Sequence, residues 1–222
     1  MTDKLEIIVT ADGSQSLRVP DLEETYPSRK GAAQESSYVF IKQGLEEVYG
    51  SKIRVFEVGF GTGLNTILTL EYARQKSMQI EYTAIEKYPV GLEIIRDFSR
   101  DWLELRCLRD DFLNMHDLGW GTWNTINITF LIRKVEEDWM NYEFDSHYDL
   151  IYYDAFAPSR QSEMWEIELL QKCHDALVNE GLLVTYCAQG QFRRNLEAVG
   201  FTVERIPGPP GKREMIRARK IR

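Results

Sequence analysis

The sequence predicts an α/β protein with a doubly wound, mostly parallel β-sheet. Short apolar or β-branched segments alternate with segments of helical periodicity along most of the chain, which is typical of sheets covered by helices on both faces. A glycine-rich loop, Gly59 to Gly63, separates an apolar segment from a helical one, and the acids Glu86 and Asp154 end two further apolar segments. Such sheets bind ligands at the carboxyl ends of their strands. The loop and both carboxylates are therefore expected at one cleft.

Turn residues and periodicity predict the elements in chain order. Residues 4–9 and 16–20 flank an Asp12-Gly13 turn, and Asp-Gly between short apolar runs predicts a β-hairpin. Later apolar segments predict strands over residues 53–58, 80–85, 126–132, 148–153, 182–187, 201–206 and 214–218. Helices are expected over residues 35–49, 64–75, 162–180 and 189–199, with a further helix opening at Pro89.

The helix before Gly181 has the clearest local signals. Ser162 suits the N-cap position, and Glu163 and Glu166 in the first turn suit the positive end of the helix dipole. Gly181 is expected to end this helix. Apolar residues recur every four positions and predict one buried face: Trp165, Leu169, Cys173 and Leu177.

Length and composition are those of one globular domain. The 222 residues are 43% hydrophobic and 28% charged, which suits a single domain with a sizeable core. We expect an N-terminal hairpin extension over residues 1–35 and a Rossmann-like core over residues 36–222. No run of 18 apolar residues exists, and the first six residues lack a signal-peptide pattern, so no membrane contact is expected.

The spacing of the cysteines and histidines argues against a disulfide-bonded protein of an oxidising compartment and against a metal-binding protein. Cys107, Cys173 and Cys187 are widely separated and form no C-x-x-C pair, which indicates a reducing, cytoplasmic location and no zinc site. The three histidines, His116, His147 and His174, also lack the spacing of metal ligands. We therefore expect no bound metal.

The charge distribution is uneven. The net charge of −8 counts against a nucleic-acid partner, which usually meets a basic surface. Basic residues nevertheless gather near the C-terminus, in Arg193, Arg194, Lys212, Arg213, Arg217, Arg219, Lys220 and Arg222. Charges act locally because salt screens them beyond about 10 Å. An RNA-binding face on an acidic body is one interpretation, and a solvated basic tail is the other.

The loop Gly59-Phe60-Gly61-Thr62-Gly63 suits a nucleotide-like cofactor, because glycine allows positive φ angles and close backbone approach. No lysine follows it, which disfavours a P-loop nucleotide hydrolase. It matches G-x-G-x-x-G only loosely, so an NAD-dependent oxidoreductase stays a weaker alternative. Glu86 can accept ribose hydroxyl hydrogen bonds from either NAD or S-adenosylmethionine. Glu57, just before the loop, could lie near the positive charge of the latter.

The segment Asp154-Ala155-Phe156-Ala157-Pro158 suits an amine substrate. A carboxylate at a strand end can accept hydrogen bonds from an amine and orient its lone pair, Phe156 can pack on the substrate, and Pro158 stiffens the loop. An alkylammonium group has a pKa of about 10 and must lose a proton before it attacks a methyl group. Asp154 or water could accept that proton.

These residues resemble the methyltransferase domain of the tRNA 5-methylaminomethyl-2-thiouridine biosynthesis (MnmC) family. The matching stretches cover most of the chain in order: Asp12 to Ser14, Gly31-Ala32, Glu35, Tyr38 to Phe40, Glu57 to Asn65, Glu86-Lys87, Asp154 to Trp165, Arg193-Arg194, Ala198 to Phe201 and Lys212 to Met215. The resemblance implies a class I S-adenosylmethionine-dependent methyltransferase fold, with a Rossmann-like seven-stranded sheet and an N-terminal hairpin. It also implies tRNA as the partner and N-methylation of the 5-aminomethyl group of the wobble uridine.

The resemblance also implies roles for individual residues. The cofactor-binding set is Glu57, Gly59, Gly61, Gly63, Asn65, Glu86 and Asp154. The catalytic residues are Asp154 and Phe156, beside the reacting amine. The substrate-binding set is Pro158, Met164, Trp165, Arg193, Arg194, Lys212, Arg213, Glu214 and Met215.

Two departures from the family pattern qualify these expectations. The chain is expected to lack the flavin-dependent oxidase module of the two-domain members, and so to act only on the aminomethyl form. The family usually has a Gly-Asp pair after the third strand whose Asp reaches the adenine. Here that region reads Phe130-Leu131-Ile132-Arg133-Lys134, so the contact must come from elsewhere, with Asp111 as one candidate.

Two further alternatives stay open. A small-molecule amine methyl- or aminopropyltransferase would share the sheet and the strand-end Asp, and the acidic charge favours it. A non-catalytic tRNA-binding module on a degenerate methyltransferase fold is supported by the altered third-strand region.

Overall fold

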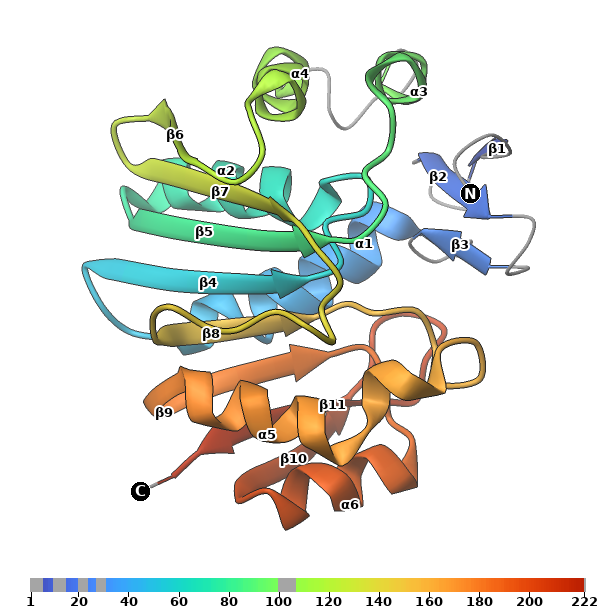
Figure 1. Ribbon diagram of the computed structural model, residues 1–222, viewed down its shortest axis with the longest axis vertical. Helices are drawn as coiled ribbons and strands as arrows, with labels where there is room; N and C mark the ends of the chain where they lie inside the picture. Colours follow the sequence, from blue (N-terminus) through green and yellow to red (C-terminus); the bar gives the residue numbers. More distant parts are fainter. Residues whose placement is uncertain (1–5, 10–14, 20–23, 27–30, 100–106, 222) are drawn as a thin grey trace.

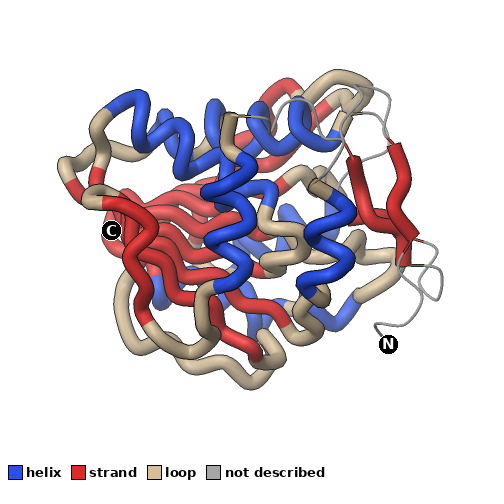
Figure 2. Tube along the Cα trace, turned by 90° about the horizontal axis from the view of Figure 1, so that it is seen from above, coloured by secondary structure: helices blue, strands red, loops and turns tan. Residues whose placement is uncertain are grey.

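The centre of the protein is an eight-stranded sheet with helices on both faces (Figures 1 and 2). The computed structural model describes residues 6–9, 15–19, 24–26, 31–99 and 107–221. The strand order is β10-β11-β9-β8-β4-β5-β7-β6. The strands are β4 (Lys52–Val58), β5 (Gln79–Glu86), β6 (Trp123–Asn127), β7 (Phe130–Glu136), β8 (Tyr148–Tyr153), β9 (Leu177–Thr185), β10 (Phe201–Pro207) and β11 (Glu214–Lys220).

Alternating side chains of the strands divide the core into two clusters. In β4, Val55 lies in the cluster that α1 (Ala32–Ser36), α2 (Leu64–Lys76), α3 (Leu92–Phe98) and α4 (Arg109–Asp117) cover. The neighbouring Phe56 lies in the cluster covered by α5 (Ile167–Ala176) and α6 (Gly190–Ala198). Both side chains are fully buried. Burial on both faces explains why the central strands read as continuous apolar runs.

The order in which successive strands are added to the sheet reverses at β4. β4 pairs in parallel with β5 on one side and with β8 on the other. The connections after β4 and β8 therefore leave toward opposite sides of the sheet, an arrangement in which α/β proteins bind ligands at the carboxyl ends of the strands. The arrowheads of β4 and β5 point to the side on which the N-terminal sheet lies (Figure 1).

The prediction of a seven-stranded sheet is wrong by one strand. The expected strand over residues 126–132 contains a turn, in which Asn127 Oδ1 accepts hydrogen bonds from the backbone N–H and the hydroxyl of Thr129. The turn separates β6 from β7, and the two strands pair antiparallel. β6 thereby extends the sheet edge, while the predicted doubly wound, mostly parallel order is confirmed.

The N-terminal hairpin is confirmed in its strands and extended by a third. β1 (Glu6–Val9) pairs antiparallel with β2 (Gln15–Val19), and β2 with β3 (Glu24–Tyr26). The predicted Asp12-Gly13 turn lies outside the described residues. The three strands form a separate sheet.

Three helix boundaries differ from the predictions. The helix expected over residues 35–49 is α1 followed by a π-helix, η2 (Ser37–Lys42), and a 3-10 turn, η3 (Leu45–Glu47). Residues Ser162–Trp165 form a separate 3-10 turn, η5, and Glu166 is the N-cap of α5. α5 ends at Ala176, and β9 already includes Gly181. Among the described residues, no helix is both long and apolar enough to cross a membrane.

Candidate functional site

The glycine loop connects β4 to α2 and lies against the end of β5. Backbone N–H groups of Gly59 and Phe60 donate to the carbonyl of Ile85 at 3.1 and 3.0 Å. The φ angles of Gly59, Gly61 and Gly63 are 89°, 53° and 75°, a region that favours glycine. A Cβ added at Gly59 would lie 2.9 Å from the carbonyl oxygen of Asp154. The loop and the Asp154 segment are therefore in contact.

Asn65, in the first turn of α2, joins the two acids nearest the loop. Its Nδ2 donates to Glu57 Oε1 at 2.9 Å and to Asp154 Oδ2 at 2.8 Å. Glu57 is fully buried and also accepts a hydrogen bond from the Thr66 hydroxyl at 3.1 Å. Asn65 Oδ1 is buried and has no hydrogen-bond partner among the described residues. The structure thus brings together a carboxylate pair and an open buried acceptor.

Burial keeps protons on this carboxylate pair near neutral pH. Desolvation raises the pKa of Glu57 to about 8, and the charge of Asp154 adds to the effect against the hydrogen bond from Asn65. Desolvation also raises the pKa of Asp154 to about 7, with Glu35 raising it further and Asn65 and Lys212 lowering it. A carboxylate with such a pKa can accept a proton at physiological pH.

These shifts predict how stability changes with pH. Above pH 6.5 the folded protein still holds protons on Glu57 and Asp154 that the unfolded chain has released, so the free energy of unfolding falls as pH rises to about 8. The slope reaches about 1.4 kcal/mol per pH unit for each such proton. Below pH 6.5 the opposite shift of buried His116, whose pKa burial lowers to about 3, opposes this trend.

Thermal melts of the ligand-free protein at pH 6.5 to 8 test this prediction. We expect the melting temperature to fall with pH and the Glu57→Gln variant to fall less. Glu93→Gln is the matched control, because the Glu93 side chain is 90% exposed. Equal pH slopes for wild type and Glu57→Gln would contradict the assignment.

Glu86, at the end of β5, is held in place by the backbone. Its Oε2 accepts a hydrogen bond from Gly61 N–H at 3.0 Å, and its Oε1 accepts one from Tyr88 N–H at 2.9 Å. Burial raises its pKa against these bonds. Each carboxylate oxygen has a second lone pair, so Glu86 can still accept hydrogen bonds from a ligand.

The segment after β8 is shaped by a buried tryptophan. Trp165 is 4% exposed, packs against Tyr153 and Phe192, and donates from Nε1 to the carbonyl of Phe156 at 2.8 Å. The hydroxyl of Tyr153 donates to the carbonyl of Met164. Trp165 therefore supports the loop that carries Phe156 and Pro158.

Lys212 contacts two residues that lie far from it in the sequence, Glu35 and Tyr186. Its Nζ is 2.5 Å from Glu35 Oε1 and 4.2 Å from the centroid of the Tyr186 ring. The sequence interpretation gave no role to Tyr186 and used Glu35 only as part of the resemblance. The position of Tyr186 directly after strand β9 was the signal that could have identified it, because strand ends line the cleft.

The remaining predicted substrate-binding residues and the basic residues near the C-terminus lie in three places: helix α6, the loop before β11, and β11 itself. Arg193 and Arg194 are in α6, where they contact Glu197 and Gln191. Arg213 is exposed in the loop between β10 and β11, which enters the sheet at the edge where β9 ends. Five more residues belong to strand β11: Met215 is buried in the core, Glu214 pairs with Arg205, Arg217 pairs with Glu204 and Glu47, and Arg219 and Lys220 donate to backbone carbonyls. Arg222 lies outside the described residues.

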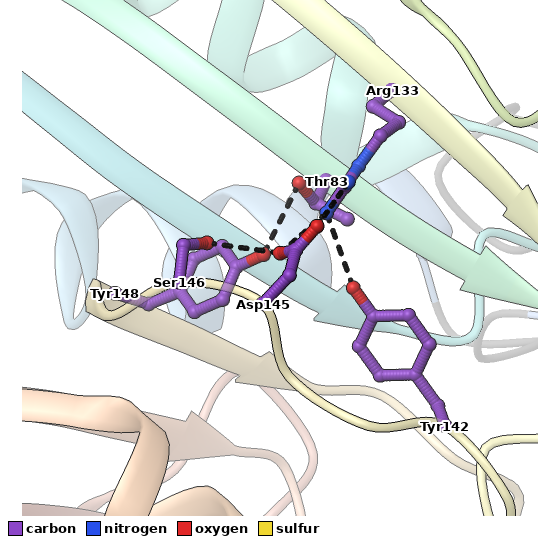
Figure 3. Close-up of polar contacts among 6 residues, drawn as sticks. All are labelled: Thr83, Arg133, Tyr142, Asp145, Ser146 and Tyr148. Carbon is purple, nitrogen blue, oxygen red and sulfur yellow. Dashed lines mark hydrogen bonds and ion pairs between the residues drawn. The ribbon is translucent and has the colours of Figure 1, made fainter.

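In β7, Arg133 and Lys134 stand where the family usually has Gly-Asp. Their side chains make polar contacts on opposite faces of the strand. Arg133 makes a bidentate ion pair with Asp145, at 2.5 and 3.0 Å, and donates to the Tyr142 hydroxyl (Figure 3). Lys134 is 1% exposed and donates to the carbonyl of His116 at 2.9 Å. Asp111, the candidate adenine contact, is paired with Arg74 at 2.6 Å. Among the described residues, no group of three or more His, Cys, Asp or Glu side chains is arranged to hold a metal.

Comparison with protein families identifies a relationship over the C-terminal part of the chain. Residues 119–221 match a family described as S-adenosyl-L-methionine-dependent methyltransferase, in agreement with the cofactor that the sequence predicts. The chain is 27% identical over 217 residues to the tRNA 5-methylaminomethyl-2-thiouridine biosynthesis bifunctional protein MnmC of Pseudomonas syringae pv. syringae, and 28% over 206 residues to that of Nitrosospira multiformis. These alignments cover 90% and 87% of this chain but 32% and 33% of the relatives. The chain thus spans about a third of their length.

Solved structures with the same fold include MnmC2 from Aquifex aeolicus. It aligns with a TM-score of 0.79 and 23% identity over 97% of this chain and 70% of that chain. Spermidine synthase from Thermotoga maritima aligns with a TM-score of 0.55 and 14% identity, covering 99% of this chain and 70% of that one. The predicted class I methyltransferase fold and the resemblance to MnmC proteins are confirmed.

Proposed function

We propose that this chain, which has the fold of the class I S-adenosyl-L-methionine-dependent methyltransferases, methylates the 5-aminomethyl group of the wobble uridine in tRNA to give 5-methylaminomethyl(-2-thio)uridine. The observation that carries the proposal is the contact between the glycine loop and the Asp154 segment. It places a cofactor-type loop beside an amine-type carboxylate. The names of the MnmC relatives support the choice of acceptor.

The residues around the loop suit S-adenosylmethionine. The glycines leave room for close backbone approach, Glu86 offers oxygen acceptors at a strand end, and the open Oδ1 of Asn65 can accept an N–H. We assign cofactor binding to Glu57, Gly59, Gly61, Gly63, Asn65, Glu86 and Asp154. When bound, S-adenosylmethionine supplies an electrophilic methyl group. Deprotonated Glu57 would offset its positive charge in the buried site.

Asp154 is the proposed acceptor for the amine's proton. An alkylammonium group releases its proton with a pKa of about 10, and the raised pKa of Asp154, about 7, makes this carboxylate a better base than an exposed one. Phe156 and Pro158 follow Asp154 in the loop that Trp165 supports. They form the proposed wall beside the amine, with Met164 at the opening.

We assign tRNA phosphate contacts to Arg193 and Arg194 in helix α6 and to the exposed Arg213 in the loop before β11. The prediction is that Arg213→Ala raises the KM for tRNA several-fold, leaves the cofactor Kd unchanged and lowers the salt slope of tRNA binding by about 1. Arg219→Ala is the control, because Arg219 pairs in register with Leu182 inside β9 and its side chain donates to the carbonyl of Glu180. An unchanged tRNA KM in Arg213→Ala would remove this contact.

The proposal also covers the domain organisation of the chain, its location and the form of its substrate. The chain acts as one methyltransferase domain with its hairpin extension over residues 1–35 and its core over residues 36–222, although α1 crosses that boundary. It works in the cytoplasm, without a metal. It acts on the aminomethyl form.

The decisive experiment is methyl transfer from labelled S-adenosylmethionine to tRNA that lacks this methyl group, followed by nucleoside analysis. Label in 5-methylaminomethyl(-2-thio)uridine is the expected result. Cofactor binding without label in tRNA would instead favour a small-molecule amine acceptor. Absence of cofactor binding would favour a non-catalytic tRNA-binding module.

A further inference from the structure

Lys212 occupies a cage that suits an alkylammonium ion. The Glu35 carboxylate lies 2.5 Å from Nζ, and the Tyr186 ring centroid lies 4.2 Å from it. Carboxylates and aromatic faces are the groups that recognise ammonium ions in proteins. The Glu35 side chain is only 13% exposed and that of Lys212 is 34% exposed, so the carboxylate is largely shielded from water and the lysine is half-buried.

The walls of the cage come from three separate elements that are fixed in place. Glu35 belongs to α1 and its backbone N–H donates to the carbonyl of Gly31. Tyr186 follows β9, and its hydroxyl donates to the carbonyl of Ala155 at 2.8 Å. Asp154 therefore directly precedes Ala155, the residue that accepts the hydrogen bond from Tyr186. The charges of Glu35 and Lys212 act in opposite directions on Asp154, because Glu35 raises the pKa of Asp154 and Lys212 lowers it.

Lys212 itself lies in a short, anchored loop. It lies in the loop between β10 and β11, where its N–H donates to the carbonyl of Pro209 and Gly211 has a φ of 86°. The Tyr38 hydroxyl holds the base of this loop through the carbonyl of Pro207 at 3.0 Å. The lysine side chain can leave the cage while the loop stays anchored, because its flexible four-carbon stem has several rotamers.

We propose that Glu35, Tyr186 and Asp154 form a binding site for the substrate's alkylammonium group, and that Lys212 fills this site until the substrate amine displaces it. This inference rests on the proposed function for the identity of the amine. The cage itself is independent of it. Lys212 then acts as an internal competitor of the substrate, and not as a phosphate ligand. Glu35 selects for amines and against groups that carry a negative charge at this position.

Chemical rescue tests the cage without using the reaction. Lys212→Met leaves the Glu35 carboxylate without its cation, and we expect a lower melting temperature that methylammonium chloride restores, since a ligand of the folded state stabilises it. Sodium chloride at the same ionic strength is the control. The rescue is expected to vanish in Glu35→Gln/Lys212→Met and to weaken in Tyr186→Leu/Lys212→Met. It should persist in Tyr186→Phe/Lys212→Met, which keeps the aromatic face.

Two outcomes would overturn the cage. One is a Lys212→Met melting temperature that methylammonium raises no more than sodium does. The other is equal rescue in the variant that lacks the Glu35 charge. Either result can be obtained even if the protein methylates no tRNA, so failure of the cage and failure of the proposed function are distinguishable.

Binding of tRNA gives a separate test of the displacement of Lys212 by the substrate amine. Lys212→Met should lower the KM for tRNA with 5-aminomethyluridine and leave the Kd for tRNA with unmodified uridine unchanged, because only the first carries the competing amine. A phosphate-binding lysine predicts weaker binding of both tRNAs. That pattern would contradict displacement.

Discussion

Asp154→Asn is expected to reduce methyl transfer by about 10²- to 10⁴-fold, the usual contribution of a general base, while the protein stays folded. The amide keeps the size of the side chain and an oxygen that can accept the hydrogen bond from Asn65 Nδ2, which in the native protein is 2.8 Å. It loses the ability to take a proton. The backbone N–H of residue 154, which donates to the carbonyl of Val58 at 3.1 Å, is unaffected. The loop position is therefore preserved.

The pH profile separates loss of a base from loss of structure. Asp154 accepts a proton only when ionised, and burial raises its pKa to about 7, so single-turnover rates of the wild type should rise with pH through about 7. The residual rate of Asp154→Asn should lack this rise. Circular dichroism and cofactor titration provide the controls. Asp154→Ala should behave like Asp154→Asn. Turnover like that of the wild type in either variant would remove Asp154 from the mechanism.

Gly59→Ala is expected to weaken cofactor binding by more than about 100-fold and to destabilise the fold by roughly 2 kcal/mol or more. The φ of 89° disfavours a side chain at a cost of about 1–2 kcal/mol. The new Cβ would in addition lie 2.9 Å from the carbonyl oxygen of Asp154, a backbone atom that cannot swing away. The glycine loop and the Asp154 segment would be forced apart, at the place where we expect the cofactor and the amine to meet.

Gly121→Ala is the matched control for this substitution. Gly121 has a similar φ of 79°, but no atom lies within 4 Å of its added Cβ. It should therefore show the conformational cost alone, with unchanged cofactor affinity. Calorimetric titration with S-adenosylhomocysteine and chemical denaturation measure the two effects. Equal losses of affinity in both variants would mean that the close contact between the two loops does not matter.

The parts of the site that follow the strand pattern could be predicted from sequence. The glycine loop, Glu86 and Asp154 each follow an apolar segment, and the geometry of a parallel sheet brings strand ends to one edge. The contact of Glu35 with Lys212 could not be predicted in the same way. These residues are 177 positions apart, and neither belongs to a strand, so no periodicity relates them.

Errors in the predicted elements have physical causes. The strand predicted over residues 126–132 stops short of Lys134, which is buried in β7 with its amine bonded to the His116 carbonyl and 4.9 Å from the centroid of the Trp120 ring. Gly181 was interpreted as a helix stop, but it lies in β9, where a Cβ would approach the carbonyl of Val178 to 2.8 Å. In both cases tertiary contacts outweigh the local preference of the residue.

The parallel pairing of β4 with β8 also has a consequence for the order of folding. Val55 lies opposite Leu150, far along the chain, whereas the strands of the N-terminal sheet are joined by short connections. Closing so long a loop is entropically costly and slow compared with local pairing. The glycine loop meets the Asp154 segment only once this central pair has formed. Cofactor binding during refolding should therefore appear with the slowest phase, after most of the helical signal has returned.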